Sequence, residues 1–535
     1  MVYPLRSKIV LLCIGIFLLV SCVDSNKNAI PNSQIDNKTL KIVLSDPVET
    51  LDPIKILYNS DWQVSSMIYE GLIEFNSQTN SILPSIAKSW AKYENGKRWI
   101  FKIRSDKYFH DDPCFNEGIG RAVNAFDILY NFERIGNPNR NCYNSSLFVN
   151  KIKGMLEFQN GKANSISGIN VIDSSTIEVT LNKNYITFLK VLATPFAYIV
   201  PKEAVDFYGD TFYKNPVGTG MFRLTKWSER EGLELVQNTH YQAITDLTES
   251  SSFNSIQVKT LSDPSMMISD ILKNECQIIS INNNTYNYLK TRDQLQNTCR
   301  LFVDSSTSTI RFFGFSMDNQ TEIATNNKIR KAIAQQFKNN FSKNISTEYI
   351  HANSLLPQYY LKANNYKWFE KNVSINQKSI PPEISISASS EVKDVIELNN
   401  SIKTLGLKVN LEIKKVDYYR AIITDRPDIF RVSMCPTYPD PEEYYSLFYS
   451  EAGKSVNLTN YKNAEYDSIF EQSLIEESKP KRMELYYRLE EILRNDVPFI
   501  PISQSYYKYY IVKDNIRNFS LSYGIPNYKN ISMGK

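Results

Sequence analysis

The sequence predicts an α/β protein with more than one domain-sized core, and three observations carry this prediction. The chain has 535 residues, enough for two to four such cores. A strand (383–387), a helix (392–405) and a second strand (407–413) follow one another as a β-α-β unit. The apolar run Ile429 to Met434 is typical of a buried strand, and the chain then turns and enters another helix.

The first 21 residues are predicted to be a targeting segment. Arg6 and Lys8 precede an apolar run, residues 9–20, that is too short to span a bilayer comfortably. The following Leu19-Val20-Ser21-Cys22 resembles a bacterial lipobox, which implies cleavage before Cys22 and lipidation of its thiol. Residues 22–37 are then a flexible tether rich in Asn and Ser. We therefore expect an exported protein, anchored by lipid at Cys22 to the periplasmic face or the cell surface.

Composition argues against several classes of function. Two of the 61 Lys and Arg lie in the targeting segment, and the remaining 59 stand against 57 Asp and Glu without a long charged block, so nucleic acid is not an expected partner. The chain has only 3 His, which disfavours a metal site built on imidazole. It contains neither a Gly-x-Ser-x-Gly elbow nor a His-Glu-x-x-His helix, so we expect no enzyme and no cofactor.

Five cysteines remain after Cys13 is discarded with the targeting segment and Cys22 is lipidated. Disulfides are chemically allowed in an exported protein. Proximity in sequence suggests the pairs Cys114–Cys142 and Cys276–Cys299, with Cys435 left free. Other pairings stay open, because connectivity cannot be deduced from spacing alone.

The other elements alternate along the chain in the same way. Expected in order are a strand at 38–45, a helix within 61–72, a strand at 98–104, a helix at 124–134 and a strand at 221–227. Gly218-Thr219-Gly220 lacks the spacing of a phosphate loop, and we expect it to permit a tight turn with positive φ. The polar stretch 364–382 is expected to be a surface excursion. After Met434, Asp440 is predicted to cap a helix that begins at Pro441.

Several motifs occur in an order that resembles one known family. They are Leu51-Asp-Pro53, Ile68-Tyr-Glu-Gly-Leu72, Leu83-Pro-Ser-Ile-Ala-Lys-Ser-Trp90, Phe101-Lys-Ile-Arg104 with Phe109-His-Asp111, Asn215-Pro-Val-Gly-Thr-Gly-Met-Phe-Arg-Leu-Thr-Lys-Trp227, Asn327-Lys-Ile-Arg330 and Asp496-Val-Pro-Phe-Ile-Pro501. Together they resemble the peptide/nickel class (family 5) of bacterial extracellular solute-binding proteins, the receptors of oligopeptide and dipeptide ABC importers. The resemblance runs from about Leu40 to about Asn518, and Met221 stands where the family has Pro.

The resemblance implies a two-lobed, periplasmic-binding-protein-like type II fold with an additional subdomain inserted in lobe one. Lobe one would combine residues 38–56, 170–270 and 490–535, the inserted subdomain would span 57–169, and lobe two would span 271–489. Cargo bound between the lobes would stabilise the closed form because it touches both. The resemblance also makes His110, beside Asp111 and Asp112, part of a turn after a strand rather than a metal or acid–base site.

The family match further implies where cargo binds. An extended peptide can pair its backbone with a strand edge, which gives affinity without reading side chains. One edge would come from residues 431–438, and Arg431 falls where family receptors carry a basic group for a peptide carboxylate. The residues expected to contact cargo are Leu57, Tyr58, Asn59, Arg431, Met434, Cys435, Thr437, Tyr438, Asn457, Gln504 and Ser505.

Thr437 departs from the family pattern, because peptide receptors usually have an aspartate there that holds the peptide α-ammonium. Losing that carboxylate would forfeit on the order of 2–5 kcal/mol of binding free energy. Either another acid captures the amine, or the cargo is not an ordinary free-amine peptide. Asp440 is expected to serve as the cap of its own turn rather than as this acid.

The function predicted from these observations is that of a monomeric substrate-binding lipoprotein of an ATP-driven importer. It would capture extended peptides between hinged lobes and deliver them to a membrane permease. The alternatives are a receptor of the same fold for amine-blocked or non-peptide cargo, such as a modified peptide, a sugar or a siderophore-like compound. A surface adhesin or sensor lipoprotein without a transport role is a further alternative.

Overall fold

The computed structural model describes residues 39–534 apart from a set of short gaps. These gaps are residues 77–78, 80, 141, 229, 243–251, 283–284, 287, 289–294, 296–297, 304–307, 319–320, 345–349, 362–382, 416 and 507–508. The predicted targeting segment (1–21), the tether (22–37), the lipidation site Cys22 and the surface excursion at 364–382 lie outside the described residues. Among the described helices, none combines the length and the apolar character that a membrane crossing requires.

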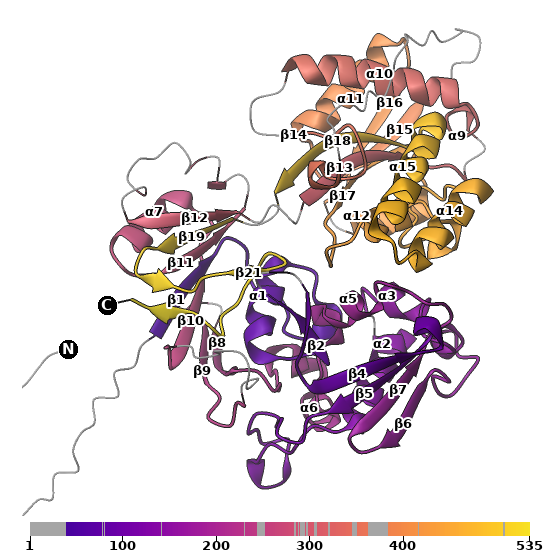
Figure 1. Ribbon diagram of the computed structural model, residues 1–535. Coiled ribbons are helices and arrows are strands. Elements are labelled where there is room, and N and C mark those ends of the chain that lie inside the picture. Colours follow the sequence, from indigo (N-terminus) through magenta and orange to yellow (C-terminus); the bar gives the residue numbers. More distant parts are fainter. Residues whose placement is uncertain are drawn as a thin grey trace, which may run out of the picture. The chain divides into compact units, whose positions relative to one another are not determined.

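Lobe one is built on a mixed sheet whose strands come from distant parts of the chain (Figure 1). The strand order is β12-β19-β11-β1-β10-β9-β8. β1 pairs in parallel with β10 and β11, and the remaining neighbours are antiparallel. The bounds are β1 Thr39–Leu44, β8 Phe222–Ser228, β9 Gly232–Gln237, β10 Ser255–Thr260, β11 Ile278–Ile281, β12 Cys299–Val303 and β19 Tyr509–Lys513.

Lobe two is built on a second mixed sheet with the order β14-β18-β13-β17-β15-β16. Its strands are β13 Ser308–Phe315, β14 Ile350–His351, β15 Ile384–Ala388, β16 Val409–Ile413, β17 Ile429–Met434 and β18 Phe499–Tyr506. β15 and β16 are parallel and are joined by α11 (Lys393–Thr404), which confirms the predicted β-α-β unit. β17 has the bounds that its apolar run predicted.

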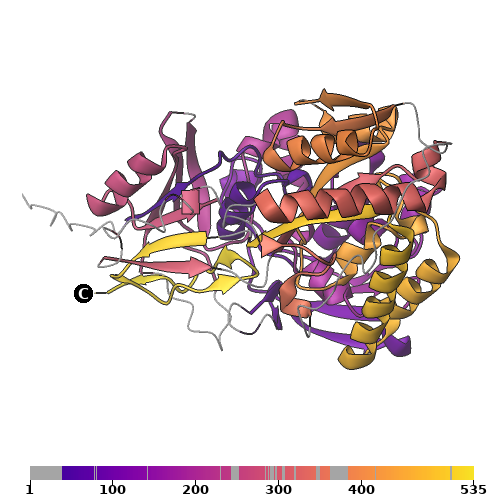
Figure 2. The same ribbon diagram turned by 90° about the horizontal axis from the view of Figure 1, so that it is seen from above.

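Helices cover both faces of the lobe-two sheet. On one face Phe313 meets Phe337 of α10 (Asn327–Asn344), and Figure 2 shows this long helix, in salmon, running along the sheet. On the other face Phe312 meets Phe448, which follows α13 (Glu442–Ser446). The remaining helices of this lobe are α9 Glu322–Thr325, α12 Tyr418–Asp425, α14 Ala464–Ile475 and α15 Lys479–Asp496.

The inserted subdomain is organised by an antiparallel sheet with the order β4-β5-β7-β6. Its strands are β4 Ala87–Tyr93, β5 Arg98–Ile103, β6 Ile169–Asp173 and β7 Thr176–Thr180, and its helices are α2 Ala125–Gly136, α3 Ser146–Val149 and α4 Met155–Gln159. α2 begins where the Asn124 side chain accepts a hydrogen bond from the Phe126 N–H, and Asp127 accepts one from the Asn124 N–H.

Shorter elements complete the described chain around these sheets. They are α1 Asn59–Ile68, β2 Ile73–Phe75, β3 Ile82–Pro84, α5 Phe188–Leu192, α6 Lys202–Tyr208, α7 Pro264–Leu272, β20 Ile516–Arg517, β21 Leu521–Ser522, β22 Ile525–Pro526 and β23 Ser532–Met533. β21 and β22 form a hairpin, and β20 pairs with β23. The mixed helix and sheet content confirms the predicted α/β class.

Sheet membership corrects the predicted domain boundaries. β11 and β12, residues 278–303, belong to the lobe-one sheet, although 271–489 was predicted to be lobe two. β18 belongs to the lobe-two sheet, although 490–535 was assigned to lobe one. β6 and β7 pair with β5, so the inserted subdomain continues to residue 180 instead of ending at 169. Its predicted start at 57 also shifts, since Gln63 of α1 hydrogen-bonds Ser280 of β11 at 2.9 Å. The chain changes sheet between Val303 and Ser308 and again between Tyr506 and Tyr509.

The role of Gly218 and Gly220 also differs from the prediction, because neither has a positive φ. A Cβ atom on Gly218 would overlap the Ile68 carbonyl oxygen, and the Gly220 N–H donates to that same oxygen at 2.8 Å. The ring Nε2 of buried His110 lies 2.9 Å from the Gly220 carbonyl oxygen, and burial lowers the pKa of His110 to about 4. The glycines therefore permit close approach to the end of α1, with a neutral His110 packed beside them.

The four cysteines predicted to pair have free thiols in the structure, as does Cys435. Gln277 and Cys299 lie on opposite sides of Lys513 in β19, because Lys513 donates to the Gln277 carbonyl and is the register partner of Cys299. Cys276, the residue before Gln277, and Cys299 pack in the same hydrophobic cluster of lobe one with both thiols free. The other two lie in separate loops: Cys114 bonds Asp112, and the residue after Cys142 bonds Ile54.

A substitution at Gly218 tests the close approach. We expect Gly218→Ala to lower the free energy of unfolding by roughly 3 kcal/mol, because the new methyl group meets backbone atoms that cannot move aside. Gly118→Ala is the control: its Cβ would meet no atom within 4 Å, and only its φ of +71° makes the change unfavourable, by about 1 kcal/mol. Urea denaturation of both variants measures the difference. If both variants lost the same free energy of unfolding, the backbone around Gly218 would be able to move aside for the new methyl group.

Candidate functional site

The turn after β17 is held by side chains of the helix that follows it. Asp440 accepts a hydrogen bond from the Glu442 N–H at 3.1 Å, so it caps α13 as predicted, with the helix beginning one residue later than Pro441. The Glu443 carboxylate folds back over the turn. It accepts bonds from the Thr437 N–H at 2.6 Å, the Thr437 hydroxyl at 2.8 Å and the Tyr438 N–H at 3.0 Å. Position 437 and Glu443 therefore form one unit.

A cavity of about 500 Å³ lies at the end of β17, between lobe two and the inserted subdomain. Four of the predicted cargo-contacting residues share its lobe-two wall: Met434, Cys435, Thr437 and Tyr438. The opposite wall is built from the subdomain and the segment after β7, with Leu147, Lys151 and Tyr185 among its residues. The volume is within the range of small-ligand sites.

Ion pairs join the two walls behind the cavity. Lys151 lies 2.6 Å from Glu442, and Lys190 of α5 lies 2.8 Å from Asp440. Arg482 of α15 binds both carboxylate oxygens of Asp440 at 2.8 Å. Burial by itself would raise the pKa of Asp440, but Arg482 and Lys190 outweigh it and hold the pKa below its usual value.

Glu443 differs from its acidic neighbours because no described cation forms an ion pair with it. Its exposed fraction is only 8%, and it lines the cavity. Burial raises the pKa of Glu443 to about 7, and the nearby Glu442 adds to the effect. The hydrogen bonds from Thr437 and Tyr438 only partly offset the loss of water.

Other residues predicted to contact cargo form hydrogen bonds or ion pairs with neighbours in lobe two. Arg431 makes a bidentate ion pair with Asp394 of α11, at 2.8 and 2.9 Å, on the sheet face covered by α10 and α11. Asn457 is buried, and its amide group bonds Tyr449, Thr459 and Tyr461 in a turn. A cargo contact of Asn457 stays a prediction. Gln504 accepts from the Gln358 N–H, and Ser505 accepts from Arg311.

Leu57, Tyr58 and Asn59 are not brought to the cavity. Leu57 and Tyr58 are exposed at the entry to α1, and their backbone conformation is held by Asp61, which accepts from the Tyr58 N–H at 3.3 Å. Asn59 is the first residue of the helix. A cargo contact of these three residues stays a prediction.

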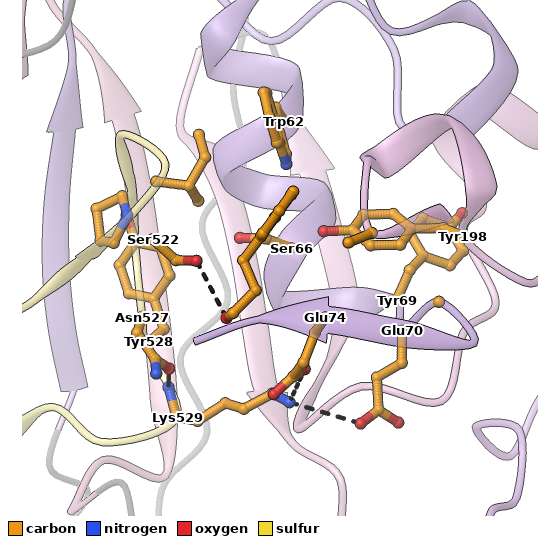
Figure 3. A pocket seen from close by; sticks show the side chains of 15 residues that line it. Trp62, Ser66, Tyr69, Glu70, Glu74, Tyr198, Ser522, Asn527, Tyr528 and Lys529 are labelled. Carbon is orange, nitrogen blue, oxygen red and sulfur yellow. Dashed lines mark hydrogen bonds and ion pairs between the residues drawn. The ribbon is translucent and has the colours of Figure 1, made fainter. Parts of the chain in front are cut away.

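A second, smaller pocket of about 90 Å³ lies in lobe one (Figure 3). Trp62 and Ser66 project into it from α1, and Tyr69 stacks on Tyr198 at 6.0 Å on the far side. Lys529 points toward two carboxylates, Glu74 at 2.7 Å and Glu70 at 3.6 Å. Glu70 is also paired with buried Lys107 at 2.7 Å, so the charges of this pocket balance.

Sequence reasoning missed this pocket because its residues come from three distant segments. The C-terminal segment also links it to the cavity, since Ser522 lines the pocket and the next residue, Tyr523, reaches lobe two. The buried Tyr523 hydroxyl donates to the Pro436 carbonyl oxygen at 3.2 Å. Tyr523 and Gly524 both have positive φ, as the two-residue turn between β21 and β22 requires.

Metal ligation finds no support in the described part of the chain, where no three His, Cys, Asp or Glu side chains gather around a common point. His240 pairs with Asp111 at 3.3 Å on the surface.

Comparisons with known proteins agree with this architecture. Residues 81–456 match the sequence model of a family described as bacterial extracellular solute-binding proteins, family 5 Middle. The periplasmic oligopeptide-binding protein OppA of Salmonella typhimurium is 24% identical over 498 residues, 87% of this chain and 87% of that protein. The probable deoxycholate-binding periplasmic protein YgiS of Escherichia coli is 25% identical over 488 residues, 86% of each chain.

A solved structure shows the same two-lobed fold. It is the ABC transporter-associated periplasmic binding protein DppA of Helicobacter pylori in complex with the peptide STSA. The TM-score is 0.72 at 18% identity, and the match covers 94% of this chain and 99% of that one. The two-lobed α/β architecture predicted from the sequence is thereby confirmed.

Stability of the unliganded protein should report the state of Glu443. Its pKa is about 7 in the folded protein and near 4.5 when unfolded, so the folded state holds the proton more tightly. Stability therefore falls as pH rises from about 4.5 to 7. At pH 8 we expect Glu443→Gln to be more stable than wild type by roughly 1–3 kcal/mol, and at pH 5 to be similar. Chemical denaturation at both values measures this, with Glu451→Gln as an exposed control.

Loss of Lys151 should favour separation of the lobes. The exposed fractions of the Lys151 and Glu442 side chains are 10% and 4%, so Lys151→Met leaves the buried Glu442 carboxylate with only the more distant Arg482, at 3.7 Å, as a counter-charge. We expect a larger radius of gyration in small-angle X-ray scattering. Lys92→Met is the matched control, since the Lys92–Glu477 pair also joins subdomain and lobe two but is 46% and 64% exposed. If Lys151→Met left the radius of gyration unchanged, the Lys151–Glu442 ion pair would not be one of the contacts that hold the lobes together.

Proposed function

Because this chain belongs to family 5 of the bacterial extracellular solute-binding proteins, we propose that it captures extended peptides for an ATP-driven importer. The family consists of substrate-binding proteins of transporters, which are not enzymes. Two relatives in the comparison carry peptide-binding names or titles, OppA and the DppA complex with STSA. Their cargo supports a peptide as the cargo of this chain.

The observation that carries the proposal is the cavity at the end of β17, walled by both lobes. β15 pairs with β17 only at Ile429 and Phe430. The backbone N–H and carbonyl of Arg431 are bound by the Tyr418 hydroxyl of α12, so the part of the β17 edge left for a guest lies beyond Arg431, toward the cavity. An extended peptide can add its backbone to such an edge. A guest held there would touch both walls and thereby favour the closed form, which is the form a permease can distinguish from the empty receptor.

We propose that lipid at Cys22 anchors a monomer to the cell envelope and that ABC permease subunits accept the cargo. The Leu19-Val20-Ser21-Cys22 motif supports the anchor. The importer partner follows from the transporters that family members serve.

A second candidate is cargo without an amine group. Features of the turn that lines the cavity support it. Thr437 carries no charge, Pro436 has no N–H to offer a peptide backbone, and the Pro436 carbonyl is bound by Tyr523. The relative YgiS is named as probably deoxycholate-binding. Deoxycholate is therefore the appropriate competitor in a test of cargo class.

Thermal shift separates the two cargo classes. We expect a mixture of synthetic tri-, tetra- and pentapeptides to raise the Tm of the mature protein in a concentration-dependent way, because cargo that binds only the folded state stabilises it. Deoxycholate below its micelle concentration is the comparison, and free amino acids are the control. Stabilisation by deoxycholate alone would assign the cavity to amine-free cargo, and peptides without any effect would reject the proposed function.

A further inference from the structure

We propose that Glu443 binds an ammonium group of the cargo in the cavity at the end of β17. This inference rests on the proposed function, because it assigns the chemistry of one subsite within the same cavity. It also decides between the two explanations that Thr437 left open: another acid takes over the amine. The ammonium can come from the peptide terminus or from a lysine side chain, and the experiment below distinguishes these sources.

The geometry of the carboxylate leaves one place for a further donor. Oε2 of Glu443 accepts two hydrogen bonds, from the N–H groups of Thr437 and Tyr438. Oε1 accepts one, from the Thr437 hydroxyl. A carboxylate has about four lone-pair sites, so Oε1 can accept one more bond. The three existing bonds fix the carboxylate in the cavity wall, which prepares it to receive a donor without further ordering.

The position of the charge also fits. The Glu443 Oε1 atom lies 2.8 Å from the Thr437 hydroxyl, so the negative charge stands next to the side chain at position 437. Thr437 itself supplies two of the three bonds that hold the carboxylate. The uncharged Thr437 therefore orients the carboxylate of Glu443, which lies six residues later in the chain.

The other acids around the cavity are engaged or exposed. Glu442 is bound by Lys151 and by the Thr187 hydroxyl. Asp440 is bound by Arg482 and Lys190. Glu451 lines the cavity but is exposed, so water solvates it. Of the acids in this region, Glu443 alone is both buried and without an ion pair to any described cation.

The charge balance of the cavity points the same way. Its lining cations are Lys151 and Lys183, and each has a carboxylate partner, Glu442 and Glu471. A buried carboxylate without a counter-charge is unfavourable and protonates instead, which agrees with the raised pKa of Glu443. An ammonium group in the cavity would supply the missing charge. The lobe-one pocket of Figure 3 offers no such opening, because Lys529 and Lys107 already neutralise its glutamates.

The experiment compares lysine-free tetrapeptides with the same mixture after N-acetylation. It uses the full mature protein at pH 8 and records the peptide concentration that gives one fixed Tm shift, the same for every variant and mixture. For wild type we expect acetylation to raise this concentration roughly 10- to 100-fold, as for one charge-assisted hydrogen bond. Glu443→Gln should show the same loss with free-amine peptides and no further loss on acetylation.

Two variants control for structural effects. Glu443→Asp keeps the charge on a shorter side chain, so it should retain part of the preference for free amines. Glu484→Gln removes an exposed charge on α15 outside the cavity lining and should behave as wild type. A third mixture, N-acetylated tetrapeptides with one lysine, tests the source: recovery of Glu443-dependent binding assigns the ammonium to the side chain, and no recovery assigns it to the terminus.

The failures are distinguishable. If wild type binds free, N-acetylated and lysine-containing N-acetylated peptides equally, or if Glu443→Gln keeps the wild-type preference, the role of Glu443 is overturned while the proposed peptide receptor stands. If no mixture shifts the Tm of wild type, the proposed function itself is rejected and this inference with it.

Discussion

The buried carboxylate of Asp440 is the interaction on which the site depends. It receives two bonds from Arg482 of α15, one from Lys190 of α5 and one from the backbone at the start of α13. One group thus ties the turn after β17 to its own lobe, to the helix it begins and to the opposite wall. Because a buried charge is tolerated only when it is compensated, this geometry leaves little freedom to the turn. Glu442 and Glu443 then point to different partners, although they are adjacent in the chain.

Local signals made much of lobe two predictable from sequence, and non-local pairing set the limit. The bounds of β17 follow from its apolar run, and the capping role of Asp440 follows from the prolines around it. The lobe boundaries were wrong because β18 crosses from the end of the chain to pair with β13, a partner that no local pattern names. Glu443 was missed for a related reason: its contact with Thr437 exists only once the turn has folded back. Gly218 has its close neighbour in α1, about 150 residues earlier in the chain.

The two concave regions illustrate two ways of handling charge. In the lobe-one pocket, lysines and glutamates are paired with one another within the protein. The surface left for a ligand there is mainly the aromatic side chains of Trp62, Tyr69 and Tyr198. At the end of β17 the ion pairs join the walls, while one carboxylate is left to the interior of the cavity. A protein that binds peptides through their main chain needs few specific side-chain contacts. A single charge in a fixed position can then set the orientation of a ligand whose side chains vary.

The hairpin of β21 and β22 gives the end of the chain a part in this arrangement. Tyr523 is buried at its tip, with its ring 6.4 Å from Trp62 and 6.1 Å from Phe75, and its hydroxyl on the Pro436 carbonyl. The Pro436 carbonyl therefore receives its partner from the other lobe, and the Tyr523 ring is covered only while this contact exists. A two-residue turn outside both large sheets thus carries a direct link between lobe one and lobe two.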